Sequence, residues 1–251
     1  MVELQARAER LRALLLADEL LVLANVWDVA SARLVAGLGH PALATASAAI
    51  TASLGYPDDD TIPPDEMFAG VRRIAAAVEV PVTADLEAGY ELEPVELVGR
   101  LLGAGAVGMN LEDTDHHGDG RFVDAGVQAS RLRAVKDAAR VAGVDVVLNA
   151  RVDTPDLAEA LERARLYVEA GADSVYPINL SEPADLRSFV SELGAPVNAL
   201  VRPGSPTLSE LASWGVARVS FGPGLQHVAL GAVERFLNRI DADEPVYRDR
   251  G

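Results

Sequence analysis

The chain contains no cysteine, which excludes disulfides, thiolate nucleophiles and zinc–thiolate sites. Lysine is almost as scarce, since Lys136 is the only one among 251 residues. Schiff-base catalysis on a barrel needs a desolvated lysine at the end of a strand. Lys136 lies instead in "SRLRAVKDAARVAG", which has the pattern of a helix. The sequence therefore disfavours a lysine-dependent aldolase.

Basic charge is also short relative to acidic charge. The chain has 22 Lys and Arg residues against 38 Asp and Glu residues, a formal net charge of −16. Such an excess repels nucleic acids and anionic membranes, so neither is predicted as a partner. A small anionic substrate remains compatible with this charge, because a bound divalent cation reverses its sign locally.

Long apolar runs are missing as well. The first residues, "MVELQARAERLRALLLADELLVL", carry charges throughout their first half and lack the basic-then-apolar pattern of a signal peptide. Their apolar runs are too short to span a bilayer. We therefore expect a cytoplasmic protein.

Short apolar runs typical of buried parallel strands alternate with longer runs typical of helices. Glycine follows most of the predicted helices, as in "GLGHPA" and "EAGADS", where it permits a left-handed cap. Eight strand–helix units without a linker predict an α/β fold, a single-domain (β/α)8 TIM barrel over residues 1–251. A doubly wound open sheet is the alternative, but no G-x-G-x-x-G follows the first strand.

The predicted strands cover residues 20–26, 42–46, 80–84, 106–111, 144–149, 174–178, 196–201 and 218–221. The predicted helices cover residues 2–17, 29–38, 64–78, 93–102, 127–141, 156–170, 182–193, 208–214 and 225–240. Residues 1–19 form an N-terminal helical segment, and residues 47–63 are predicted to be a long polar loop. Residues 225–251 hold the last helix and a tail, which we expect at a subunit interface.

Acidic side chains gather at the ends of neighbouring predicted strands, where a barrel carries its chemistry. Asp85 and Glu87 follow the third strand and Glu112 follows the fourth. Converging carboxylates repel one another and need either shared protons or a cation. Oxygen ligands without nearby His or Cys favour Mg2+ or Mn2+ over zinc. Arg151, one strand further, is placed to hold a substrate carboxylate or phosphate bidentately.

Other polar residues at strand ends leave two interpretations open. Asp28 and Asp153 suit helix caps or partners of nearby arginines as well as a catalytic site. His116 and His117 lie in a glycine-flanked loop after the fourth strand. The pair suits either a solvated loop or an acid–base group that titrates near neutrality.

The segments "NVWDVASARLVAGLGHPALATASAAITASLGYPD", "PVTADLEAGY", "GMNLEDTD" and "NARVD" resemble the isocitrate lyase and phosphoenolpyruvate mutase superfamily. The resemblance extends from about Asn25 to "RVSFGPG". It implies an enzyme that acts on α-keto acids, or on α-hydroxy di- and tricarboxylates. Such enzymes proceed through an enolate that Mg2+ and oxyanion-binding groups stabilise.

The resemblance also implies a role for each matching residue. Asp85 is expected to contact Mg2+ directly, while Glu87 and Glu112 hold its water ligands and Asp58 of "GYPD" supports them. The substrate would be held by Trp27, Ser47, Ala48, Ala49, Arg151, Asn179 and Asn198. In that set, Ser47 to Ala49 bind one carboxylate beneath Trp27. Arg151 binds the other anionic end of the substrate.

One loop departs from the superfamily pattern. The lyases carry Lys-x-Cys-Gly-His after the fourth strand and the mutases carry Lys and Asn-Ser there, whereas this chain has "EDTDHHGDGRFVDAGVQ". The usual acid–base group is therefore absent, and His116 and His117 become the catalytic candidates beside Arg151.

The expected function is a Mg2+-dependent lyase, with Mn2+ as the other candidate metal. It would cleave a C–C bond or decarboxylate a small 2-oxo or 2-hydroxy acid resembling oxaloacetate or methylisocitrate. The alternatives are C–P chemistry of the phosphonopyruvate hydrolase or mutase type, and a non-catalytic carboxylate-binding descendant. We expect a homodimer or homotetramer.

Overall fold

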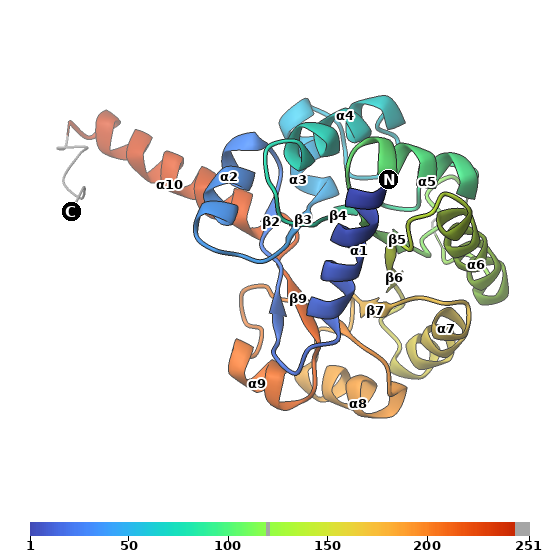
Figure 1. Ribbon diagram of the computed structural model, residues 1–251. Helices are drawn as coiled ribbons and strands as arrows, with labels where there is room; N and C mark the ends of the chain where they lie inside the picture. The colour runs from blue at the N-terminus through green and yellow to red at the C-terminus, as the bar shows by residue number, and fades with distance from the viewer. Residues whose placement is uncertain (119–120, 244–251) are drawn as a thin grey trace.

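The computed structural model describes residues 1–118 and 121–243 and shows a ring of helices around a central parallel sheet (Figure 1). The strands are β1 (Leu21–Val22), β2 (Asn25–Val26), β3 (Leu43–Thr45), β4 (Val82–Asp85), β5 (Gly108–Glu112), β6 (Val147–Val152), β7 (Ser174–Pro177), β8 (Asn198–Leu200) and β9 (Arg218–Ser220). The helices are α1 (Val2–Leu15), α2 (Val29–Gly37), α3 (Ser47–Leu54), α4 (Pro64–Ala75), α5 (Pro94–Gly103), α6 (Ala125–Val141), α7 (Leu157–Glu169), α8 (Pro183–Leu193), α9 (Leu208–Ser213) and α10 (Gly224–Asp241).

The strands close on themselves. One hydrogen-bonded sheet runs from β2 to β7 in sequence order, and the other has the order β1-β9-β8. A parallel bridge between Val175 and Val197 joins β7 to β8. On the other side, β1 pairs with β9 and β2 pairs with β3. The predicted (β/α)8 barrel is therefore confirmed, and the first predicted strand, 20–26, is divided into β1 and β2 to complete the closure.

The segment predicted as a long polar loop, 47–63, is partly helical, and this prediction was wrong. Residues Ser47–Leu54 form α3, which ends at Gly55 with a left-handed φ of 84°. The sequence of the helix, "SAAITASL", is rich in alanine, which favours helix. Its first residue stands just past the carboxyl end of β3, so the helix N-terminus lies at one end of the barrel.

Helix α1 packs across the opposite end of the barrel (Figure 1). Gly108 at the start of β5 has no room for a side chain, because a Cβ there would lie 2.9 Å from Leu11 Cδ2. Arg12 donates from Nε to Asp173 at 2.9 Å, and from Nη2 to the carbonyl of Asp145 at 2.9 Å. Helix α1 is thus fixed to the segments that lead into β6 and β7.

The single lysine completes this charged cluster. Lys136 is buried, and its Nζ contacts Asp145 at 2.7 Å, Asp173 at 2.9 Å and the carbonyl of Val146 at 2.8 Å. Its ammonium uses all three donors in these contacts. The lysine therefore has a structural role at the end of the barrel where the strands begin, away from their carboxyl ends.

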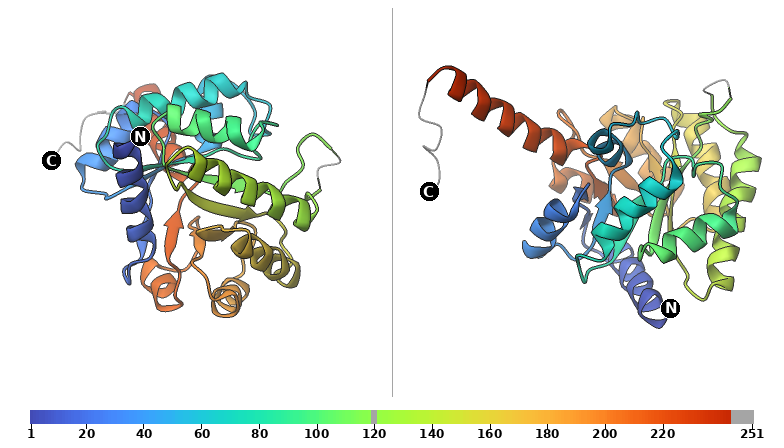
Figure 2. Two further views of the ribbon diagram at one scale, coloured as in Figure 1. Left: turned by 45° about the vertical axis from the view of Figure 1, so that its right-hand side comes forward. Right: turned by 90° about the horizontal axis from the view of Figure 1, so that it is seen from above.

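Helix α10 extends away from the barrel (Figures 1 and 2). Gln226 is its only buried residue within the described part of the helix, and its Nε2 donates to the carbonyl of Ala49 at 2.8 Å. Five large apolar side chains of the helix are exposed: Val228, Leu230, Val233, Leu237 and Ile240.

Across residues 1–118 and 121–243, no helix combines the length and the apolar character that crossing a bilayer requires.

We predict that Lys136→Met lowers the free energy of unfolding by about 3 kcal/mol, because it leaves two partly buried carboxylates short of a cation. Urea unfolding followed by circular dichroism measures the loss. The control is Arg140→Ala, which removes an exposed ion pair with Asp137 and should cost less than about 0.5 kcal/mol. Equal losses in the two variants would contradict a structural role for the buried lysine.

Candidate active site

Parallel pairing brings the predicted site residues to one end of the barrel, here called the barrel mouth. Asp85 is the last residue of β4 and pairs with Asn110 on β5. Glu112 is the last residue of β5 and pairs with Arg151 on β6. Because the strands run in the same direction, all of these side chains stand at the carboxyl ends, where barrel enzymes carry their chemistry.

The Asp85 carboxylate is held by donors from helix α3 and from strand β5. Its Oδ2 accepts from Ser47 Oγ at 2.9 Å and from the Ser47 backbone N–H at 3.3 Å. Its Oδ1 accepts from Asn110 Nδ2 at 3.1 Å, and its own N–H donates to Thr45 Oγ1 at 3.0 Å. Ser47 is the first residue of α3, so the positive end of that helix dipole faces the carboxylate.

A deeper residue fixes the orientation of Asn110. The fully buried Arg218 of β9 donates from Nη2 to Asn110 Oδ1 at 3.0 Å, and Asn149 Nδ2 donates to the same oxygen at 2.9 Å. With its oxygen occupied by two donors, the amide presents Nδ2 to Asp85. Burial lowers the pKa of Arg218 to about 10, so its guanidinium stays charged at neutral pH. The sequence analysis did not identify this cation.

Glu112 lies between the guanidinium of Arg151 and the imidazole of His116. Its Oε2 contacts Arg151 Nη1, and its Oε1 lies 2.5 Å from His116 Nε2. Arg151 is also held bidentately by Asp153, through Nε at 2.7 Å and Nη2 at 2.8 Å. This confirms the interpretation of Asp153 as an arginine partner. Asn179, a predicted substrate residue, donates to the carbonyl of Asp153 at 2.7 Å and so supports the same pair.

Glu87 faces the neighbouring loop. It has a left-handed φ of 50° and is buried. Its carboxylate accepts from the backbone N–H of Asp60 at 2.5 Å and from the Tyr90 hydroxyl at 3.3 Å. Asp60 and Tyr90 are contacts that the sequence analysis did not anticipate.

Burial is the main cause that raises the pKa of three carboxyl groups at the barrel mouth, and neighbouring carboxylates add to each shift. Burial, together with the charges of Asp58 and Asp85, raises the pKa of Glu87 to about 8. Burial raises that of Glu112 to about 7, although Arg151 opposes the shift. Desolvation and the charge of Asp85 raise the pKa of Asp58 as well. A cation at the barrel mouth would offset both the burial and the mutual repulsion of these carboxylates.

The donors at the barrel mouth suit a hard divalent cation, because they are carboxylate and hydroxyl oxygens. Within residues 1–118 and 121–243, however, no three His, Asp or Glu side chains are arranged to hold a metal ion. This geometry is compatible with one direct carboxylate ligand and others that act through water, the arrangement expected for Asp85, Glu87, Glu112 and Asp58.

The two histidines of the β5–α6 loop both meet carboxylates. The hydrogen bond to Glu112 is the largest cause of a raised pKa at His116, opposed in part by burial. His117 Nε2 lies 3.1 Å from Asp60 Oδ2. The structure therefore does not support the interpretation of this pair as a wholly solvated loop.

The remaining predicted residues vary in position. Trp27 is half-buried, and the adjacent Asp28 caps α2 by accepting from the Ser31 N–H at 2.7 Å, so the cap interpretation of Asp28 is confirmed. Ala48 is half-buried and Ala49 is buried in the first turn of α3. Asn198 is fully buried inside the barrel, where it donates to Ser220 Oγ at 3.0 Å.

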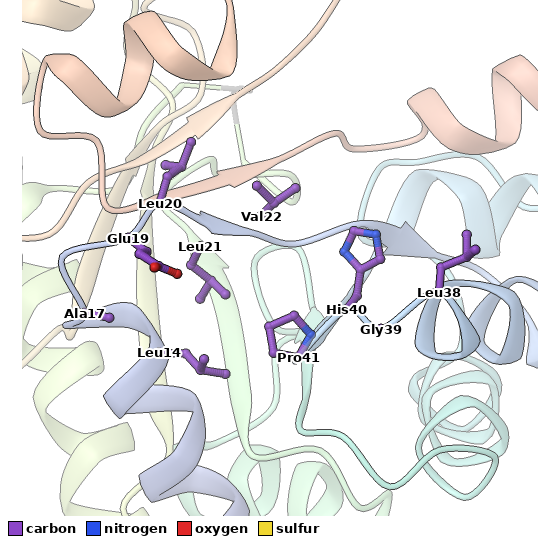
Figure 3. Close-up of a pocket in the computed structure, with 10 residues that line it drawn as sticks. All are labelled: Leu14, Ala17, Glu19, Leu20, Leu21, Val22, Leu38, Gly39, His40 and Pro41. Atoms are coloured by element: carbon purple, nitrogen blue, oxygen red, sulfur yellow. The ribbon is translucent and has the colours of Figure 1, made fainter.

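A cavity of about 350 Å3 lies at the other end of the barrel (Figure 3). It is formed by the end of α1, the residues around β1 and the turn before β3, and His40 is its one histidine. Leu21 and Val22 form β1 itself, and the other lining residues precede β1 or β3 instead of following a strand. The cavity is therefore separate from the candidate site.

Comparisons with known proteins identify the family to which the chain is similar. The family described as phosphoenolpyruvate phosphomutase matches residues 11–241. A crystal structure from Burkholderia cenocepacia J2315 is 37% identical with a TM-score of 0.88, over 94% of this chain and 99% of that one. Oxaloacetate acetylhydrolase in complex with its product oxalate is 29% identical with a TM-score of 0.87, over 97% and 89% of the two chains. The 2-methylisocitrate lyase of Escherichia coli (strain K12) is 28% identical over 79% of this chain and 71% of its own.

The raised pKa values predict how stability depends on pH. Glu87 and Glu112, whose ordinary pKa is 4.5, bind protons more tightly in the folded state than in the unfolded state. The free energy of unfolding should therefore fall as pH rises from about 5 to about 8 without divalent cation. Urea unfolding across this range measures the slope. Glu87→Gln should flatten it and the exposed control Glu91→Gln should not, whereas a parent stability that rises with pH would contradict the assignment.

Proposed function

This chain belongs to the phosphoenolpyruvate phosphomutase family, within the isocitrate lyase and phosphoenolpyruvate mutase superfamily, and from that premise we propose that it is a Mg2+-dependent lyase. Its substrate would be a small 2-oxo or 2-hydroxy acid resembling oxaloacetate or methylisocitrate. The observation that carries this proposal is Asp85 beside the Glu112–Arg151 pair on consecutive strand ends. In that arrangement Asp85 would bind a cation, and Arg151 would bind an anionic group of the substrate.

The cation would be held at Asp85, with Glu87, Glu112 and Asp58 around its water ligands; Mn2+ would suit the same oxygens. When bound, it supplies positive charge where the substrate oxygen becomes an enolate. The raised pKa values of the surrounding carboxyl groups support this proposal, because a cation beside them would offset the cost of burying their negative charge. Asn110 and Ser47 would keep the Asp85 carboxylate oriented in the absence of substrate as well.

Substrate binding would use both sides of the barrel mouth. Backbone N–H groups of Ser47, Ala48 and Ala49 open α3, and a helix N-terminus favours a carboxylate. Arg151 would bind the other anionic end, with Asp153 fixing the plane of its guanidinium. Trp27 would cover the substrate, while Asn179 and Asn198 complete the far wall.

Cleavage breaks the bond between the carbon α to the carbonyl group and the departing group, which leaves as CO2 or, once its hydroxyl has given a proton to a base, as an aldehyde. The bonding electrons move onto the carbonyl oxygen as an enolate. A proton must then return to carbon. His116 suits this step, because its hydrogen bond to Glu112 raises the pKa of the imidazole and so favours its protonated form. His117 stands one residue away, against Asp60, and is the second candidate.

C–P chemistry on phosphonopyruvate is the second candidate function. The match to the phosphoenolpyruvate phosphomutase family favours it, and Arg151 suits a phosphonate as well as a carboxylate. A panel of oxaloacetate, methylisocitrate, citramalate-like acids and phosphonopyruvate with Mg2+ separates the two functions. Pyruvate or oxalate released from carboxylic acids supports the lyase. Conversion of phosphonopyruvate to phosphate and pyruvate, or to phosphoenolpyruvate, supports C–P chemistry.

We predict that Asp85→Ala weakens Mg2+-dependent binding of oxalate, an enolate mimic, by more than about 100-fold, since loss even of outer-shell groups costs 10–100-fold. Titration calorimetry measures the affinity. Glu91→Ala, an exposed acid on the same loop, is the control and should bind like the parent. If Asp85→Ala bound oxalate as tightly as the parent, the proposed metal site would be refuted.

The protein is also proposed to be a homodimer or homotetramer that buries α10. Leu230, Val233 and Leu237 are exposed at spacings of three and four residues, so they share one face of the helix. An apolar face of this kind is costly to leave in water.

We predict that a Val233→Asp, Leu237→Asp double variant lowers the molar mass in light scattering to that of a smaller assembly. Val141→Asp, which changes a 90% exposed valine on α6, should leave the mass unchanged. A parent that is already monomeric would rule out the proposed assembly.

A further inference from the structure

Asp60 occupies a backbone conformation that would suit glycine. It lies in the loop between α3 and α4 with a φ of 61°, in the left-handed region that a Cβ disfavours. Its side chain is nevertheless buried, with 3% of the residue exposed. An aspartate kept in a disfavoured conformation and away from water indicates that its carboxylate makes contacts that matter.

Those contacts join three loops at the barrel mouth. Asp60 Oδ1 accepts from the backbone N–H groups of Ala88 at 3.2 Å and Tyr90 at 3.1 Å. Its Oδ2 lies 3.1 Å from His117 Nε2. Its own N–H donates to the Glu87 carboxylate. Asp60 therefore makes three contacts with the β4–α5 loop, through Oδ1 and its N–H, and a fourth with the β5–α6 loop through Oδ2.

The β4–α5 loop needs such external support. Glu87, Gly89, Tyr90 and Glu91 all have positive φ, between 50° and 90°. Only Gly89 adopts this region without a steric penalty. The Ala88 and Tyr90 N–H groups, both directed to a single oxygen of Asp60, tie this run in place. Glu87 lies within the run, so its position depends on the same carboxylate.

Among the described residues, the adjacent Asp59 makes no hydrogen bond to the other two loops, so these contacts between loops are specific to Asp60. Asp59 accepts from the Thr61 N–H at 3.3 Å and from the Thr61 hydroxyl, both inside its own turn. Asp60 instead makes every contact described above with another loop. Two adjacent aspartates thus serve different purposes, and the first offers a matched control for the second.

We infer that Asp60 is a positioning residue of the reaction. Its carboxylate holds Glu87 and the segment 113–118, which carries His116, in one relative arrangement. The inference rests on the proposed function, because it takes Glu87 and His116 to serve the chemistry there. His117 then acts as the contact through which the β5–α6 loop is located, while His116 faces Glu112 and the substrate side.

The test compares Asp60→Gly, Asp60→Asn, His117→Ala, the Asp60→Gly/His117→Ala double variant and the control Asp59→Ala in the full chain. Glycine suits a φ of 61° and keeps the N–H that donates to Glu87, so Asp60→Gly removes only the carboxylate. Amide hydrogen exchange of the free protein reports on the segments 86–91 and 113–118. Calorimetry with Mg2+ and oxalate reports on the site.

Asp60→Gly should speed exchange about tenfold in both segments, whereas His117→Ala should do so only in 113–118. The double variant should exchange no faster in 113–118 than Asp60→Gly does, because the two changes remove the same contact. Oxalate affinity should fall about tenfold in Asp60→Gly and less in Asp60→Asn, which keeps an acceptor for the two N–H groups. Asp59→Ala should match the parent in both measurements.

Exchange that stays within twofold of the parent in both segments of a folded Asp60→Gly would overturn the inference. Faster exchange with unchanged oxalate affinity would also overturn it, since Asp60 would then stabilise the loops without positioning the site. Failure of the proposed function would show separately, as a parent that neither binds oxalate with Mg2+ nor turns over any acid of the panel. The exchange comparison alone would then decide whether Asp60 couples the two loops.

Discussion

The ion pair between Arg151 and Glu112 is the contact on which the barrel mouth depends. Each group is costly to bury alone, and each compensates the other across the β5–β6 pairing. Asp153, the residue just after β6, then fixes the guanidinium plane by a bidentate contact. Arg151 is engaged in this way and Arg218 is directed to Asn110, so Asp85 has no direct cationic partner among the described contacts. A metal ion would suit this carboxylate.

The candidate site is held in place partly by a buried network of residues outside it. Asp113 accepts from the Asp153 N–H at 2.9 Å and from the Tyr167 hydroxyl at 2.7 Å. Arg163 of α7 donates to Asp113 at 3.2 Å and to the carbonyl of Val123 at 2.8 Å, where the β5–α6 loop returns to its helix. Buried networks of this kind hold functional side chains in one geometry before a substrate arrives.

What the sequence predicted well depended on short-range regularity. Alternation of side chains along a strand places Asp85 at a strand end, and parallel strands bring Glu112 and Arg151 beside it. Helix α3 escaped notice because "SAAITASL" lacks the apolar period of a packed helix and follows a strand directly.

Asp60 and Arg218 escaped notice for a different reason. The value of Asp60 lies in its contacts with loops about 30 and 60 positions away, and nothing in "PDDDTIP" distinguishes it from Asp59. Arg218 occupies the first position of an apolar strand, where a charged residue is usually expected to point to solvent. Its inward direction follows from the closed barrel and from Asn110 on the far side.

The pairing of β1 with β9 has a consequence for how the protein is made. Leu21 meets Arg218, so nearly the whole chain must leave the ribosome before the ring can close. Until then β1 presents unpaired N–H and C=O groups at an open edge, the kind of surface that recruits other strands. Helix α1, which emerges first, has its contacts with Asp145 and Asp173 available only after β6 and β7 are synthesised. Slow translation or low chaperone supply should therefore promote aggregation of this protein mainly before its last strand is synthesised.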